Sequence, residues 1–161
     1  MRGLGRAIES RLRAWTQLGR SGGGEAMKES QFWALVKGKL PGHVERVENA
    51  LTRGTPDVNM CHEGNELWLE LKVLDAKGKC ELRPEQVLWH RKRQESGGRV
   101  FVLARNENVL KVLQIQREMD LYEIWSCTKP FDWENMNSLL FNVPPFCTEY
   151  VVRHAQVGGK Q

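Results

Sequence analysis

The chain has 161 residues, of which 40% are apolar and 27% are charged, and its formal net charge at pH 7 is +4. These values predict one globular domain with an appendage. They argue against a membrane protein, because no apolar run approaches the roughly 20 residues that a membrane span needs. The sequence has four cysteines without metal-ligand spacing: Cys61, Cys80, Cys127 and Cys147. This argues against a zinc site and a disulfide framework. We therefore expect a cytoplasmic protein.

The excess positive charge lies near the N-terminus. Residues 1–28 carry six Arg and Lys side chains against two Glu, a net charge of +4, so the rest of the chain is balanced. Apolar residues recur there at helical spacing: Leu4, Ile8, Leu12 and Trp15. Over residues 1–26 we predict a basic amphipathic helix and a glycine-rich linker. This segment would contact nucleic-acid phosphates or a partner, or form a loosely ordered extension.

A second helix is predicted from about Met27 to Lys37, with Phe32 and Val36 on its apolar stripe. Steps of three and four residues place Glu29 on the same stripe, where a carboxylate needs a partner. The alternative is that Glu29 is a first-turn residue favoured by the helix dipole. Residues 43–50 alternate weakly and predict a first strand.

A hairpin is predicted next, because His62–Asn65 forms a polar, glycine-containing break between two strand-like runs. In the second run, Leu67, Leu69, Leu71 and Val73 alternate with Glu66, Trp68, Glu70 and Lys72, so the two sets occupy opposite faces. A turn centred between Glu63 and Gly64 sets Asp57 opposite Glu70, and a turn one residue later sets it opposite Lys72. In both registers Asp57, Glu70 and Lys72 share a face.

Two carboxylates and an ammonium group on one face are typical of a hard-metal site with a cationic helper. Mg²⁺ takes oxygen ligands, commonly one or two carboxylates with phosphate and water, and we expect Mn²⁺ to substitute for it. A lysine beside the metal would orient or help deprotonate an attacking water, or offset charge developing on a phosphate. The pattern therefore predicts phosphodiester hydrolysis. The alternative is that Glu66, Glu70 and Lys72 form the solvated face of an ordinary strand.

Five further elements are predicted downstream. Pro84 begins a helix that ends before Gly97, and Arg99–Arg105 reads as a central strand. Asn106 is expected to cap another helix, in which Val109, Val112 and Leu113 face the sheet. A short strand over residues 121–125 and a helix over residues 132–141, capped by Asp132, complete the prediction.

Candidate nucleic-acid contacts lie in two places. Two arginines, Arg46 and Arg53, flank the Thr55–Asp57 turn. A cationic block lies on the helix that begins at Pro84: His90, Arg91, Lys92 and Arg93. Each could bind the phosphate backbone. The alternatives are surface salt bridges for the first pair and an ordinary solvated helix face for the block.

Together these residues resemble the PD-(D/E)XK nucleases. The motif is Gly54-Thr55-Pro56-Asp57 followed by Glu70-Leu71-Lys72. Gln86 and the run Gly97–Val102 make the chain most similar to the phage and bacterial VRR-NUC branch, which resembles Holliday-junction resolvases. The likeness covers roughly residues 27–115. It implies an α/β fold with a restriction-endonuclease-like core over residues 27–118, a mixed central sheet that contains a catalytic hairpin and is flanked by helices.

The resemblance also implies site roles and a function. Glu29 would complete the metal site with Asp57 and Glu70, with Glu45 or Glu48 as alternatives for the third carboxylate. The amide of Gln86 would donate to a phosphate or hold a metal-bound water. The implied activity is a Mg²⁺-dependent DNA endonuclease acting on branched DNA, in the host cytoplasm if a phage encodes it. The alternatives are a catalytically silent nucleic-acid-binding or assembly module on the same fold, and a nuclease with an RNA or restriction-type substrate.

Residues 119–161 lie outside the resemblance and are rich in aromatic side chains: Trp125, Phe131, Trp133, Phe141 and Phe146. We expect this extension to pack on the core or on a second copy of the chain in a homodimer, with base stacking less favoured.

Overall fold

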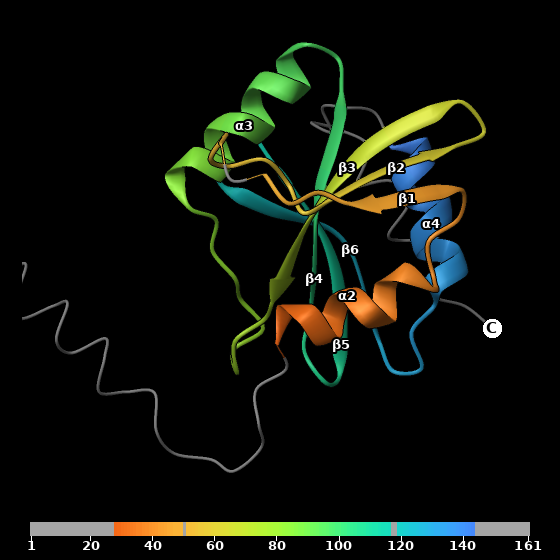
Figure 1. The fold of residues 1–161 in the computed structure, drawn as a ribbon. Helices are drawn as coiled ribbons and strands as arrows, with labels where there is room; N and C mark the ends of the chain where they lie inside the picture. The colour runs from red at the N-terminus through yellow and green to blue at the C-terminus, as the bar shows by residue number, and fades with distance from the viewer. Residues whose placement is uncertain (1–27, 50, 117–118, 144–161) are drawn as a thin grey trace, which may run out of the picture.

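The computed structural model describes residues 28–49, 51–116 and 119–143 (Figure 1). The predicted basic helix and linker of residues 1–26 lie outside this part of the chain. The elements follow in the order α2 (Glu29–Lys37), β1 (His43–Arg46), β2 (Val58–His62), β3 (Asn65–Val73), α3 (Pro84–Glu95), β4 (Arg99–Arg105), β5 (Val109–Ile115), β6 (Leu121–Thr128) and α4 (Trp133–Asn142).

The six strands form one mixed sheet whose spatial order is the same as their order in the chain. β3 and β4 run parallel, and the other neighbouring pairs are antiparallel. A parallel pair needs a crossover connection, and α3 supplies it between β3 and β4. The protein therefore has an α/β fold with a mixed sheet flanked by helices.

Helices cover both faces of the sheet (Figure 1). Phe32 of α2 and Leu140 of α4 belong to the main core, together with the odd-numbered leucines of β3. The even-numbered residues of β3 point to the opposite face, where α3 packs and Gln86 reaches Glu70. α3 thus covers the part of this face that carries Glu70, whereas Glu66 at the start of the strand stays exposed. In the sequence the whole face resembles a solvent-facing strand surface.

The hairpin adopts the first of the two predicted registers. Val58 pairs with Leu69 and Met60 with Leu67, so the turn is centred between Glu63 and Gly64. Both turn residues have positive φ, 50° for Glu63 and 76° for Gly64, as a tight hairpin turn with the sheet's twist requires.

The helix predicted after Asn106 is wrong, because Val109–Ile115 is strand β5. The Asn106 side chain instead closes a turn, since its Oδ1 accepts from the backbone N–H groups of Asn108 and Val109. β5 alternates regularly: Leu110 and Val112 belong to the main core, whereas Val109 and Leu113 pack in a smaller cluster on the other face of the sheet. Because both faces of β5 are packed, its apolar residues also satisfy the spacing of a helix, and this spacing misled the prediction.

The C-terminal part of the described chain belongs to the same sheet and core. β6 pairs with β5, and Asp132 caps α4 by accepting from the N–H of Asn135 at 2.9 Å, as predicted. Four of the five aromatics pack, partly buried, against the main core: Trp125, Phe131, Trp133 and Phe141. Phe146 lies outside the described residues. We therefore do not assign these aromatics to a dimer interface. Among the described helices, none has the length and apolar character of a membrane span.

Candidate active site

The hairpin register brings Asp57 next to Glu70. Asp57 directly precedes β2, and continuing the pairing of Val58 with Leu69 sets it opposite Glu70. Its Oδ2 accepts a hydrogen bond from the backbone N–H of Leu71 at 2.9 Å. This bond ties the Asp57 carboxylate to β3, so both carboxylates are held by the backbone of one hairpin.

Glu70 is a buried carboxylate with one satisfied oxygen. The residue is 1% exposed. Its Oε1 accepts from Gln86 Nε2 and lies 3.0 Å from Lys72 Nζ. Its Oε2 is buried and has no hydrogen-bond partner among the described residues. Buried polar atoms are almost always paired, so this oxygen indicates a site for a cation or a proton.

The first turn of α3 orients Gln86. Gln86 Oε1 accepts from the backbone N–H of Arg83 at 2.9 Å, which leaves its Nε2 to donate to Glu70. The Asp57 turn is docked on the same helical turn through Gly54, whose φ is +88° and whose Cβ, if present, would lie 2.2 Å from the carbonyl oxygen of Glu85. Both conformation and space therefore require glycine here. This contact joins the Asp57 turn to the helix that carries Gln86.

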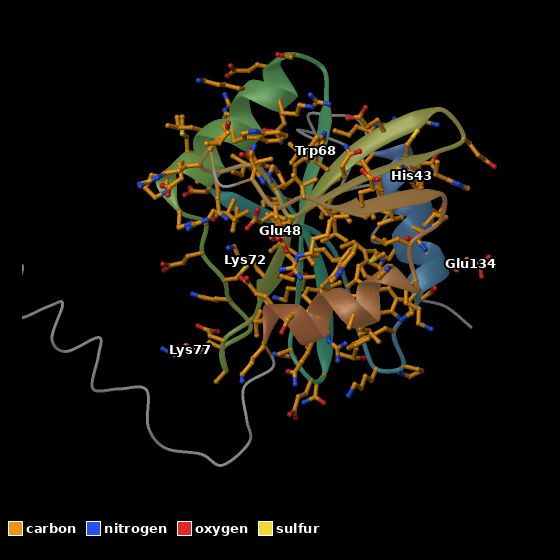
Figure 2. All side chains as sticks on the ribbon, viewed as in Figure 1. His43, Glu48, Trp68, Lys72, Lys77 and Glu134 are labelled. Carbon is orange, nitrogen blue, oxygen red and sulfur yellow. The ribbon has the colours of Figure 1, made fainter. Side chains whose placement is uncertain are left out.

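Lys72 lies between two carboxylates and is labelled in Figure 2. Its Nζ is 3.0 Å from Glu70 Oε1 and 4.0 Å from Glu29 Oε1. The Glu29 side chain is 55% exposed, so the expectation that it lies on a buried face is wrong. Within the described ranges, no three His, Cys, Asp or Glu side chains are grouped closely enough to hold a metal. The contact of Glu29 with this site is its ion pair with Lys72.

The two alternatives for the third carboxylate lie elsewhere. Glu45 Oε1 is 3.5 Å from His43 Nε2 on the exposed strand β1. Glu48 is exposed and lines a cleft together with Asp57. Of the three glutamates, Glu29 lies within ion-pair distance of Lys72, and Glu48 shares a cleft with Asp57.

The protonation of Glu70 reflects its surroundings. Burial raises the pKa of Glu70 to about 7, and the negative charges of Asp57 and Glu29 add to this rise, while Lys72 lowers the pKa. Perturbed carboxyl groups of this kind are concentrated at functional sites. A bound cation would act in the same direction as Lys72 and favour the ionised form.

This pKa predicts a pH-dependent stability difference for Glu70→Gln in EDTA. The native carboxyl, with a pKa of about 7 against 4.5 for an unperturbed group, holds its proton longer than the unfolded one as pH rises. Native stability therefore falls between these pH values and then levels off. The variant lacks this loss, so relative to the parent it should gain up to about 3 kcal/mol between pH 4.5 and pH 8.

The measurement is urea unfolding of both proteins at several pH values, with Glu107→Gln as the control for losing one exposed negative charge. A stability difference between parent and Glu70→Gln that does not change with pH would show that the Glu70 carboxyl is not perturbed.

Of the predicted nucleic-acid contacts, Arg46 and Arg53 lie beside the site. Both line the cleft that Asp57 also lines. The prediction is wrong for His90, which is fully buried on the sheet side of α3. Burial, together with the positive charge of Lys72, lowers the pKa of His90 to about 4, so the ring is neutral at pH 7. A buried neutral imidazole does not contact a phosphate backbone.

The other cationic residues of α3 have different surroundings. Arg91 is 3.2 Å from Glu95, and its side chain is only 16% exposed. Arg93 is 2.9 Å from Glu66, and its guanidinium lies over the rings of Trp68 and Trp89. Lys92 is exposed. Arg93 and the two tryptophans anchor α3 to β3, so we assign Arg93 a structural role.

Sequence reasoning missed Arg83, which lines the same cleft as Asp57. The signal was present, because Arg83 directly precedes Pro84 at the start of the predicted helix. In the sequence it is separated from Asp57 by the whole hairpin.

No protein-family model matches this sequence, and no curated protein matches it either. Support for a function therefore comes from the site geometry and the short motif.

Proposed function

We propose that the protein is a divalent-metal-dependent DNA endonuclease that acts on branched or otherwise structured DNA. The observation that carries this proposal is the buried Glu70 carboxylate, opposite Asp57 and in contact with Lys72 and Gln86, with one oxygen left unpaired. The order helix, three strands, helix, strand from Glu29 to Arg105 supports a restriction-endonuclease-like core of the PD-(D/E)XK type.

The residues fit a hard divalent cation. Carboxylate oxygens are the protein ligands that Mg²⁺ prefers, and the unpaired Glu70 Oε2 is such an oxygen. Asp57 and Glu70 would hold the ion, and Glu29 stays a proposal for the third ligand. When bound, Mg²⁺ or Mn²⁺ would supply a Lewis acid for phosphodiester hydrolysis.

The remaining side chains orient the site and supply positive charge. Gln86 donates to Glu70, so its supported role is to hold that carboxylate in place. Lys72 holds an ammonium group beside Glu70 in a largely buried position, with its side chain 16% exposed. There it would orient the attacking water or offset negative charge developing on the phosphate. A module that only binds nucleic acid has no use for a buried carboxylate with a perturbed pKa, and this favours catalysis over silent binding.

The proposal is tested by incubating the protein with labelled duplex, nicked, single-stranded and four-way-junction DNA, and with single-stranded RNA, in Mg²⁺, in Mn²⁺ and in EDTA. We expect strand cleavage in either metal, strongest on the junction, and none in EDTA. An Asp57→Asn preparation purified in parallel controls for contaminating nucleases. Binding of these nucleic acids without any cleavage would instead identify a catalytically silent binding module.

A further inference from the structure

A polar cleft of about 590 Å³ opens beside Asp57. Its volume is within the range of small-molecule sites, so it has room for a nucleotide. Three arginines from separate parts of the chain line it: Arg46, Arg53 and Arg83. Guanidinium groups bind phosphate oxygens through paired hydrogen bonds, so three of them around one cleft favour a phosphate ligand.

The features that build the candidate active site also position these arginines. Arg46 pairs with Val58, and the next residue, Val47, donates its N–H to the carbonyl of Asp57 at 2.8 Å. The backbone N–H of Arg83 donates to the Gln86 amide that holds Glu70. The cleft and the carboxylate site therefore share a frame.

The loop that carries Arg53 is braced from within and from outside. Asn49 Oδ1 accepts from the N–H groups of Leu51 and Thr52 at 3.0 and 2.9 Å, and Gly54 packs on the first turn of α3. Arg53 lies between these two fixed points, so its backbone is held at the rim of the cleft.

The charge of the cleft depends on Asp57. Glu48 and Glu85 also line it, so with Asp57 ionised the three arginines are balanced. Arg83 Nε is 3.9 Å from Glu85 Oε1, and the two side chains are 68% and 36% exposed. Such a long, solvated contact holds Arg83 only weakly. A divalent cation on Asp57 would leave the cleft with an excess of positive charge, and an anion would then bind more favourably.

We propose that this cleft binds the phosphate group of the nucleotide next to the scissile bond, with Arg46, Arg53 and Arg83 as its ligands. This inference rests on the proposed nuclease function and adds a subsite to it. Asp57 borders both the cleft and the carboxylate site. The scissile phosphodiester would lie at Asp57 and Glu70, and the same strand would continue into the cleft.

The test compares Arg46→Gln, Arg53→Gln and Arg83→Gln with the parent in binding a fluorescent DNA junction in Ca²⁺, a cation that takes oxygen ligands as Mg²⁺ does, and a denaturing gel of the same samples checks that the junction stays intact. Each variant should weaken binding about tenfold and reduce the slope of log affinity against log salt by about one. Lys129→Gln is the matched control, because Lys129 is exposed and follows β6 at the opposite edge of the sheet from β1.

A second measurement locates the phosphate. Single neutral methylphosphonate linkages are placed in turn along the strand, and affinity is measured for the parent and for Arg83→Gln. The parent should lose affinity at one linkage near the cleavage point, and Arg83→Gln should lose less at that linkage, because one of the three arginine contacts to that phosphate is already absent. Additive losses at every linkage would overturn the subsite, because they would show that Arg83 and that phosphate do not interact.

The outcomes separate this proposal from the nuclease function. If the parent cleaves DNA and the three arginine variants bind like Lys129→Gln, the cleft proposal fails while the nuclease stands. If no substrate is cleaved and the variants still show the single-linkage pattern, the phosphate cleft stands and the nuclease fails.

Discussion

Asp57→Asn and Glu70→Gln are each expected to abolish metal-dependent cleavage while the fold survives. Either change removes one of the two carboxylates that would hold the metal, and we expect at least about a 10³-fold loss in kcat/KM, equivalent to about 4 kcal/mol. The fold should tolerate both. The amide introduced by Asp57→Asn retains an oxygen that can accept from the Leu71 N–H, and Glu70→Gln removes a buried charge.

Cleavage is measured at saturating Mg²⁺ over DNA concentrations that extend below KM, so that kcat/KM is obtained, with circular dichroism and thermal unfolding as the check on folding. Glu63→Gln is the matched control, because Glu63 lies at the tip of the same hairpin with its side chain 82% exposed. Full activity in a purified, folded Asp57→Asn or Glu70→Gln protein would refute the site assignment.

Lys72→Met is expected to lower kcat about 10²- to 10³-fold while the affinity for DNA changes little. The ammonium is 3.0 Å from Glu70 and largely buried, so it is placed for the reacting phosphate rather than for the DNA surface. Removing it also removes the main influence that lowers the pKa of Glu70, so that pKa should rise further. Part of the loss should then appear as weaker metal binding at neutral pH.

Metal titrations of the cleavage rate at two pH values separate the two effects, because the midpoint gives the metal affinity and the plateau at saturating DNA gives kcat. Raising the pH should restore metal binding to Lys72→Met without restoring kcat. Lys72→Arg, which keeps the charge in a different shape, tests whether charge alone suffices. If higher DNA concentration restored full turnover to Lys72→Met, Lys72 would act in binding and not in chemistry.

Local rules predicted much of the fold, because they depend on neighbours in the chain. The alternation of Glu66–Val73 predicted β3 and its two faces, Pro84 marked the start of α3, and Asp132 marked the cap of α4. The same alternation placed Glu70 and Lys72 on one side of the strand. It could not predict that α3 covers this side, because that contact links residues far apart in the sequence.

Other features depended on how distant segments meet. The sequence allowed two hairpin registers, and the pairing of Val58 with Leu69 selected one. The spacing of Val109, Val112 and Leu113 suited a helix, but the residues of this run pair with β4 on one side and with β6 on the other. Hydrogen bonding along a sheet edge is a long-range interaction, so it overrides a local periodicity that both structures can satisfy.

The chemistry of the candidate site divides in the same way. Residue types and their spacing predicted which groups are present and that Asp57, Glu70 and Lys72 share a face, because a strand repeats every two residues. Packing between distant segments buried Glu70 beneath α3 and raised its pKa, turned His90 inward and brought Arg83 into the cleft that Asp57 lines. Burial and charge proximity arise from packing between distant segments, and residue spacing along the chain does not contain that information.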